Sequence, residues 1–176
     1  MVKYNPNFKK AWAWPQKVED YFKDQIKGLY SCHVFCGSSN LGNVRVDIKQ
    51  NGFATHFEDI LNGLSFADNT FDIVFGDPPW EMPYHLRSKV MYEMRRICKP
   101  HGKIILNCNW TPNNLKGCIL LEPILVSTSR MPWANTALIF SYIKLEDILY
   151  PTNPIQEPTE PSKSGSSSSY TSQEKA

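Results

Sequence analysis

The sequence predicts an α/β fold: a Rossmann-like, mostly parallel sheet with an antiparallel hairpin at one edge. Short apolar runs typical of buried strands alternate along the chain with amphipathic stretches of helical period. Strands that alternate with helices build parallel sheets, because the crossover between two parallel strands usually contains a helix. The last two apolar runs, 118–127 and 136–144, are joined by a segment without a helical pattern, which predicts an antiparallel pair.

The first predicted element is a helix over 15–28. Pro15 stands near its start and Gly28 at its end, and these residue types favour those two positions. Four apolar side chains share one face of this helix: Val18, Tyr21, Phe22 and Ile26. Apolar runs then predict four strands, over 31–35, 43–48, 52–57 and 71–75.

A second amphipathic helix is predicted over 86–98. Its inward face carries Val90, Met91, Met94 and Ile97. The Lys-Pro-His-Gly sequence at 99–102 ends this helix, because proline cannot continue it and glycine permits a turn. A strand over 103–109 and the two runs of the edge hairpin complete the sheet. In such sheets ligands bind beyond the carboxyl ends of the strands.

Composition narrows the class of protein. With 176 residues, 41% of them hydrophobic, and a net charge of +2, the chain suits one globular domain and does not by its charge demand a nucleic-acid partner. Its five cysteines include no CxxC pair and no histidine cluster at zinc-ligand spacing, so we expect reduced thiols and no metal site. No apolar run approaches the roughly 18 residues of a membrane span, and the first residues lack a signal-peptide core. We therefore expect a cytoplasmic protein that does not enter membranes.

The chain divides by composition into three parts. Residues 151–176 are rich in Pro, Ser, Thr and Glu and almost empty of apolar residues, so we expect a disordered tail. Residues 31–150 form the predicted main domain, and residues 1–30 form a segment and helix packed on it. The first residues mix cations with aromatic rings: Lys3, Tyr4, Lys9, Lys10, Trp12 and Trp14. They suit either single-stranded nucleic acid or packing of the tryptophans on the sheet.

The strand predicted at 71–75 runs into Asp77-Pro78-Pro79-Trp80. Two prolines fix φ twice and make a stiff corner. An exocyclic amino nitrogen of a base is a poor nucleophile, because its lone pair is delocalised into the ring. The Asp77 carboxylate and the Pro78 carbonyl would assist it by stabilising developing positive charge, and Trp80 offers a flat face for an unstacked base. The alternative is a structural turn with a core tryptophan.

Three further candidates each follow or end a predicted strand. Gly37, in a glycine-containing turn, lets the backbone approach a ligand, although the turn departs from the GxGxxG pattern of dinucleotide sites. Asp47 ends the second strand, where an acid can accept hydrogen bonds from a ribose diol. Asp59 is placed to meet an adenine amino group. The alternatives are an ordinary connection for Gly37 and a turn former or helix cap for either acid.

From about Ser31 to Trp110 the sequence resembles the class I S-adenosylmethionine-dependent methyltransferases. Within them it is similar to the amino-methylating group with a (D/N)PP(Y/F/W) motif. The resemblance rests on "HVFCGSSNLG" for the cofactor loop, "VRVDI" for the ribose-binding strand, "LSFADNTFDIVFGDPPW" for the catalytic strand and "MRRICKPHGKIIL" for the helix, turn and strand after it. It implies the class I methyltransferase fold with S-adenosyl-L-methionine as cofactor.

Carried over by position, the resemblance also implies roles for individual residues. Phe35, Gly37 and Asp47 would bind the cofactor, Asp59 its adenine, and Asp77, Pro78, Pro79 and Trp80 the target amino group, with Asp77 also near the methionine moiety. Beyond the motif, His85 on a loop over the target and Arg87 beside the corner are candidate substrate-binding residues. The alternative for Arg87 is the solvated face of a helix.

The expected function is methyl transfer to an exocyclic amino group of a nucleic-acid base, with N6 of adenine in DNA or RNA as the first choice. No metal is needed, because the sulfonium is already activated. N2 of guanine or N4 of cytosine in tRNA, rRNA or DNA stays open as the acceptor, as does a non-catalytic nucleic-acid-binding subunit. The chain has no room for a target recognition domain, so recognition falls to a structured RNA, to short loops or to a partner subunit.

Overall fold

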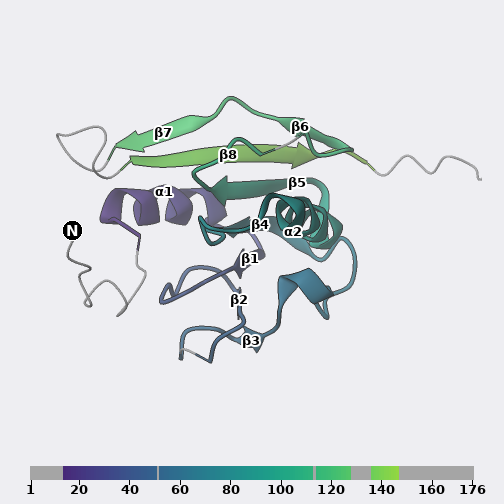
Figure 1. The fold of residues 1–176 in the computed structure, drawn as a ribbon, viewed down its shortest axis with the longest axis horizontal. Helices are drawn as coiled ribbons and strands as arrows, with labels where there is room; N and C mark the ends of the chain where they lie inside the picture. Colours follow the sequence, from purple (N-terminus) through teal and green to yellow (C-terminus); the bar gives the residue numbers. More distant parts are fainter. Residues whose placement is uncertain (1–13, 51, 113, 128–135, 147–176) are drawn as a thin grey trace, which may run out of the picture.

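The computed structural model describes residues 14–50, 52–112, 114–127 and 136–146, so the predicted tail at 151–176 lies outside the described residues. These residues form one sheet in the order β3-β2-β1-β4-β5-β8-β6, with β7 also paired to β8 (Figure 1). The strands are β1 Ser31–Val34, β2 Val44–Asp47, β3 His56–Phe57, β4 Phe71–Gly76, β5 Cys98–Asn107, β6 Cys118–Leu120, β7 Ile124–Ser127 and β8 Thr136–Lys144.

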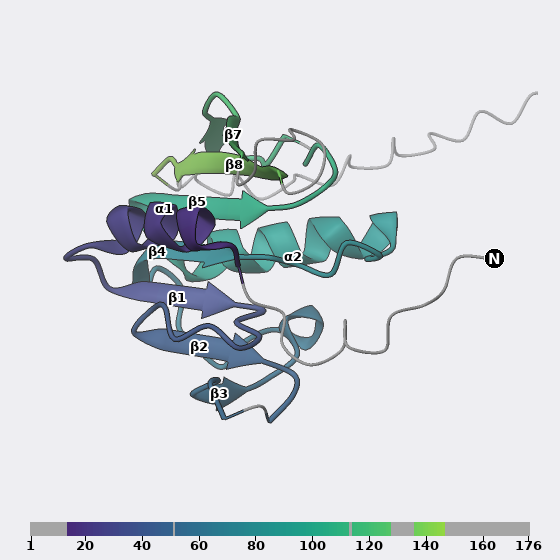
Figure 2. The same cartoon turned by 90° about the vertical axis from the view of Figure 1, so that its left-hand side faces the viewer.

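Five strands of the sheet are parallel. β1 pairs in parallel with β2 and β4, β2 with β3, and β4 with β5; Figure 2 shows the arrowheads of β1, β2 and β5 pointing the same way. β8 runs antiparallel to β5, β6 and β7. The predicted α/β fold, with a mostly parallel sheet and an antiparallel edge, is confirmed.

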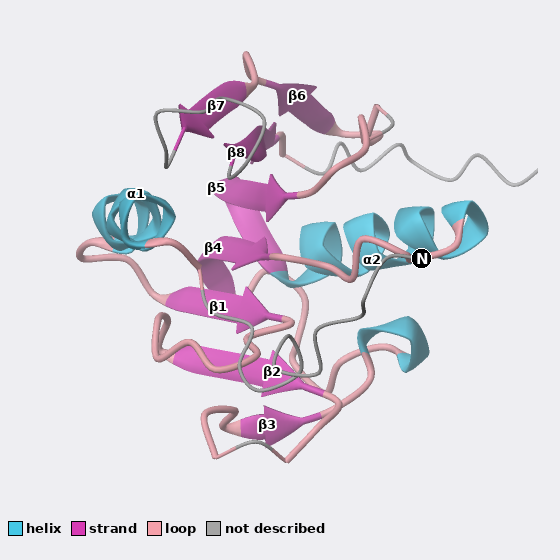
Figure 3. Cartoon of the chain, turned by 60° about the vertical axis from the view of Figure 1, so that its left-hand side comes forward, coloured by secondary structure: helices cyan, strands magenta, loops and turns pink. Residues whose placement is uncertain are grey.

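Two α-helices of the described chain lie on opposite faces of the sheet (Figure 3). α1, Gln16–Ile26, precedes β1, and α2, Tyr84–Ile97, is the crossover from β4 to β5. A 3-10 helix, η2, spans Ile60–Asn62 before β4. The described residues that connect β1 to β2 and β2 to β3 contain no helix. Neither α1 nor α2 is long and apolar enough to cross a membrane.

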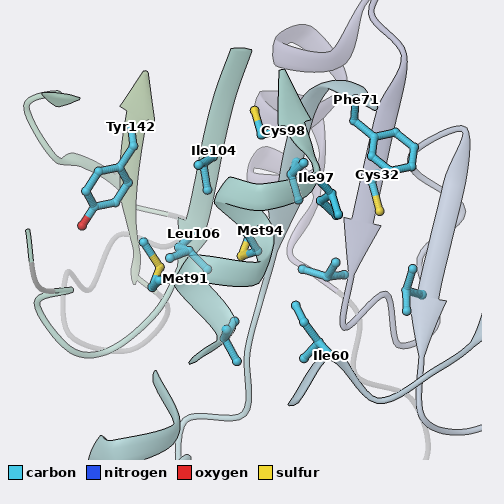
Figure 4. Close-up of a cluster of buried hydrophobic side chains, with 14 of the residues drawn as sticks. Cys32, Ile60, Phe71, Met91, Met94, Ile97, Cys98, Ile104, Leu106 and Tyr142 are labelled. Atoms are coloured by element: carbon cyan, nitrogen blue, oxygen red, sulfur yellow. The ribbon is translucent and has the colours of Figure 1, made fainter. Parts of the chain in front are cut away.

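Each face of the sheet has its own core, because successive side chains of a strand point to opposite sides. Beneath α2, Met94 and Ile97 pack with Ile104 and Leu106 of β5 (Figure 4). The apolar face predicted for the second helix is buried as expected. Beneath α1 lies a smaller core, which contains Val18, Phe22, Leu41, Ile73, Phe75 and Ile105. The connection from β1 to β2 contains no helix that could cover this face of the sheet, and α1 covers it instead.

Three elements differ from their predicted extents. The run 118–127 is divided into β6 and β7 at Pro123, which has no N–H to donate to β8. β3 keeps two residues of the predicted 52–57. β5 begins at Cys98, directly after α2, so the predicted turn at 99–102 lies within the strand. The pairing of β5 with β4 is irregular there, because Phe71 pairs with Cys98 and Ile73 with Lys103. His101 has a φ of 61° there, which fits a bulge in the strand.

Candidate active site

The carboxyl ends of β1, β2 and β4 meet at one edge of the sheet. Val34, the last residue of β1, pairs with the penultimate residue of β2 and with the last residue of β4. The residues that follow in the three strands are Phe35, Asp47 and Asp77. The fold therefore places Phe35 and Asp47, two of the predicted cofactor residues, in one row with Asp77, the first residue of the predicted target-binding corner.

Gly76 sets how closely the corner approaches β1. A Cβ atom added at this position would overlap the carbonyl oxygen of Val34. Any other residue would force β4 away from β1, so the backbone that leads into Asp77 is held against the neighbouring strand.

Asp77 is held by a residue that the sequence did not single out for this role. Its carboxylate is buried, with 7% of the residue exposed, and Oδ2 accepts a hydrogen bond of 2.9 Å from Nε1 of Trp14. The Trp14 ring stacks on Phe22 of α1 and on His33 of β1, at centroid distances of 4.2 and 4.9 Å. Of the aromatic residues near the start of the chain, Trp14 thus packs on the sheet, and Trp12 lies outside the described residues.

The motif turns sharply after Asp77. Pro78 is buried and Pro79 exposed, and the backbone N–H of Met82 donates to the carbonyl oxygen of Pro79 at 2.9 Å. Met82 anchors this turn in the core, while Trp80 within the turn is 45% exposed. The alternative in which this tryptophan belongs to the core is therefore wrong.

Asp47 ties the loop after β1 to the end of β2. Its Oδ2 accepts from the backbone N–H of Gly37 and its Oδ1 from that of Lys49, both at 2.9 Å. Gly37 has a φ of 53°, and Phe35 has a φ of 57°, which is rare for a bulky side chain. Such backbone strain persists only where the surroundings impose it, and it concentrates at ligand sites.

Asp59 acts as the cap of η2. Its Oδ1 accepts from the backbone N–H of Leu61 at 3.0 Å, which satisfies one of the unpaired donors at the start of that helix. This contact corresponds to the helix-cap alternative, and an adenine-binding role for Asp59 stays a prediction.

His85 and Arg87 both belong to α2. The prediction of a loop at His85 is wrong: α2 begins at Tyr84 after Pro83, and His85 lies exposed in the first turn. Proline favours that start because its φ already suits a helix. The Nε atom of Arg87 donates to the carbonyl oxygen of Met82 at 3.0 Å, and its Cζ lies 4.3 Å from the centroid of Trp110. Arg87 is therefore fixed beside the corner and does not extend freely into solvent.

His33 lies buried beneath Trp14. Its ring stacks on Phe75 at a centroid distance of 4.4 Å, and Nδ1 is 3.3 Å from the carbonyl oxygen of Leu41. Burial lowers the pKa of His33 to about 3. The ring is therefore neutral at physiological pH, and it supports the Trp14 indole that binds Asp77.

The buried thiols of Cys98 and Cys108 are not activated nucleophiles. All five are free thiols, four of them buried. Burial raises the pKa of Cys98 to about 12 and that of Cys108 to about 11, so both stay protonated at neutral pH. Within the described residues, no group of three His, Cys, Asp or Glu side chains is arranged to hold a metal ion.

Comparison with known proteins gives one short sequence match. No family model matches the chain. The probable methyltransferase ltbC of Aspergillus luteorubrus is 49% identical over 49 residues, which cover 24% of this chain. The matched region is 16% of the length of that protein, so the match does not extend to its activity as a whole.

Solved structures match over about three quarters of the chain. TrmN from Thermus thermophilus superposes with a TM-score of 0.56 at 14% identity, covering 72% of this chain and 48% of TrmN. The N-methyltransferase NodS from Bradyrhizobium japonicum WM9, in complex with S-adenosyl-L-homocysteine, gives 0.56 at 9% identity over 73% and 86% of the two chains. The [4+2]-cyclase SpnF gives 0.51 at 12% identity over 78% and 84%. The cyclase shows that this fold is not confined to one reaction. The chain has the fold shared by S-adenosylmethionine-dependent methyltransferases.

Proposed function

We propose that this protein is an S-adenosylmethionine-dependent methyltransferase that modifies an exocyclic amino group of a nucleic-acid base, with N6 of adenine in DNA or RNA as the target. The corner after β4 carries the proposal: Asp77 is 7% exposed, and Trp80, three residues on, is 45% exposed. A buried acceptor beside an open aromatic face suits a flat base that presents an amino group.

The edge formed by β1 and β2 suits the cofactor. Asp47 stands where nucleotide-binding α/β folds place the acid that binds ribose hydroxyls, and its bond to Gly37 keeps the loop after β1 close to it. A carboxylate offers about four acceptor positions, and two backbone N–H groups occupy two of those of Asp47. When bound, S-adenosylmethionine supplies a methyl group that its sulfonium charge has already activated. NodS, which shares the fold, was crystallised with S-adenosyl-L-homocysteine.

Asp77 and Pro78 would orient the target amino group. The carboxylate of Asp77 and the carbonyl oxygen of Pro78 each accept one N–H of the amino group, which draws its lone pair out of conjugation with the ring. Acceptors fixed in a site with little water stabilise the developing positive charge without reorganising. The Trp14 indole takes one of the acceptor positions of Asp77 and so sets the orientation of the carboxylate.

Trp80 would hold the target base by stacking. Its ring lies in a turn closed by the hydrogen bond from Met82 to Pro79, so the ring stays near the corner when the base arrives. Stacking of a base on an aromatic side chain contributes about 1 to 3 kcal/mol.

Two experiments test the proposed function. Calorimetry with S-adenosylmethionine and S-adenosyl-L-homocysteine measures cofactor binding directly. Mass spectrometry of nucleosides then follows incubation of single-stranded and duplex DNA and RNA with a methyl-labelled cofactor. Labelled N6-methyladenine is the expected product, and the folded Asp77→Ala variant serves as the control that should form little of it.

The outcomes separate the alternatives. Labelled N4-methylcytosine or N2-methylguanine would keep the reaction and change the target base. Cofactor binding without a labelled nucleoside from any of the four substrates would remove the nucleic-acid target. If the protein did not bind the cofactor, the remaining alternative would be a non-catalytic, nucleic-acid-binding subunit.

A further inference from the structure

A small pocket lies between α2 and the segment that follows β5. Its volume is about 120 Å³. Its walls include Tyr84, Arg87, Ser88 and Tyr92 of α2, and Trp110 and Pro112 of the following segment. Pockets for whole drug-sized ligands measure about 300 to 1,000 Å³. This pocket, the α2 pocket, is therefore too small for an entire nucleoside cofactor and has room for one flat ring.

The walls of the α2 pocket combine open aromatic rings with a fixed cation. Tyr84 is 68% exposed and Tyr92 is 52% exposed. The guanidinium of Arg87 lies over Trp110, 4.3 Å from its ring centroid, and is tied through Nε to the carbonyl oxygen of Met82. Aromatic faces for bases and cations for phosphates are the two components of single-stranded nucleic-acid sites.

The pocket borders the catalytic corner. α2 begins at Tyr84, four residues after Trp80, and the other wall follows β5, the strand paired with β4. Arg87, which lines the pocket, donates through Nε to the carbonyl oxygen of Met82, and the backbone N–H of Met82 donates in turn to the carbonyl oxygen of Pro79 in the corner. A base at Trp80 and a ring in the α2 pocket would therefore be close neighbours.

The charge around the pocket favours a nucleic acid over a protein partner. Lys89 on α2 and Lys116 beyond the pocket are exposed. The carboxylate of Glu93 in the same helix is bound by Arg96 at 2.6 Å, so it offsets that arginine. Each nucleotide of a single strand carries one phosphate, which Arg87, Lys89 and Lys116 would attract.

We propose that the α2 pocket binds the base adjacent to the target base in a single-stranded segment of DNA or RNA. The assignment of the target rests on the proposed function, whereas the pocket's affinity for a base does not. With the target on Trp80 and its neighbour against Tyr92, beside the Arg87–Trp110 pair, the phosphate that joins them would face Arg87. Two adjacent bases held in this way cannot remain in a duplex stack. The substrate is therefore a single strand or an unpaired loop.

Binding of a fluorescein-labelled, adenine-rich 12-nucleotide single strand, measured by anisotropy with S-adenosyl-L-homocysteine present, tests this proposal. Ser88→Trp fills the pocket with an indole, and Tyr92→Ala removes one wall; each should weaken binding about 5- to 150-fold. Tyr30→Ala is the matched control, because Tyr30 is also an exposed aromatic residue, at 46%, but directly precedes β1, at the amino ends of the parallel strands and away from the corner. It should bind the strand like the wild type.

A second ligand makes the test specific for a base. In a fully abasic strand of the same length, Ser88→Trp should change the affinity little, because no base remains to enter the pocket. Wild-type affinity of both pocket variants for the intact strand would overturn the proposal and point to a protein ligand instead. Equal weakening of single strand and duplex would also overturn it.

The two proposals fail in different ways. Loss of strand binding in Ser88→Trp, with no labelled nucleoside from the wild type, would retain the base pocket and reject the methyltransferase. A labelled nucleoside from the wild type, together with unchanged strand binding by Ser88→Trp, would retain the methyltransferase and reject the base pocket. Circular dichroism checks that each variant is folded, and calorimetry with S-adenosyl-L-homocysteine should give the same cofactor affinity for each variant as for the wild type.

Discussion

Replacing Trp14 with phenylalanine removes the indole N–H that donates to Asp77 and keeps an aromatic ring in the same place. The lost bond joins Nε1 to Oδ2 at 2.9 Å, and Asp77 is 7% exposed. A phenylalanine ring can retain the stacking on Phe22 and His33, whose centroids lie 4.2 and 4.9 Å from that of Trp14. The variant therefore isolates the hydrogen bond from the packing.

The expected loss of stability follows from the charge of the acceptor. A hydrogen bond to an ionised group contributes about 1.5 to 3 kcal/mol to the free energy of unfolding. For a chain of this length, the melting temperature should fall by roughly 3 to 12 °C. Asp77→Asn makes the acceptor neutral, so in that background Trp14→Phe should cost about 0.5 to 1.5 kcal/mol. The difference between the two backgrounds is the coupling energy of the pair.

Thermal and denaturant unfolding at pH 7, followed by circular dichroism, measure all four proteins of this cycle. Trp80→Phe is the matched control: it also removes an indole N–H, from a side chain that is 45% exposed, and should change stability by about 0.5 kcal/mol or less. Single-turnover methylation at saturating cofactor should also slow in Trp14→Phe, because the Asp77 carboxylate is no longer oriented. A wild-type melting temperature together with zero coupling would refute the inference that Trp14 holds Asp77.

The remaining predictions concern the site and one buried histidine. Asp77→Ala should abolish most turnover with the fold intact by circular dichroism; wild-type single-turnover rates would make the corner a structural turn. Trp80→Ala should weaken single-strand binding about 5- to 150-fold in anisotropy and leave S-adenosyl-L-homocysteine affinity unchanged. Asp47→Ala should weaken S-adenosylmethionine binding by roughly 1 to 3 kcal/mol in calorimetry, and unchanged affinity would exclude the residue from the site. Burial lowers the pKa of His33 from 6.5 to about 3, so the contribution of the neutral His33 ring to the free energy of unfolding is complete above pH 6.5. It falls by about 1.4 kcal/mol per pH unit as the pH drops toward 3. His33→Phe should flatten this slope in denaturant titrations at pH 4 to 7, and an unchanged slope would show that His33 is not its source.

Local patterns in the sequence were sufficient to predict most elements of the fold. The apolar run of β4 and the apolar spacing that places Met94 and Ile97 on one face of α2 depend only on residues a few positions apart. The stiff corner after β4 follows from two adjacent prolines. The division of the run 118–127 also had a local signal in Pro123, although the length of β8 allows both halves to pair with it.

The candidate site was predictable in outline and not in its contacts. Parallel strands end at one edge of a sheet, so strand order was enough to place Asp47 and Asp77 there. The sequence left open whether Asp59 was a cap or a ligand, because either use suits an acid at that position. The hydrogen bond from Asp59 to Leu61 matches the cap, while the functional roles of all these residues stay predictions.

The sequence by itself determined the order of strands and helices, the apolar faces and the Asp-Pro-Pro-Trp corner, since these depend on neighbours along the chain. Only the tertiary structure decided which distant groups complete them. Trp14 reaches Asp77 across 63 positions of sequence, because α1 packs on the sheet face above β1 and β4. Arg87 and Trp110 meet because α2 returns alongside β5. The packing of the helices on the sheet fixes such contacts, and a pattern of neighbouring residues does not encode that packing.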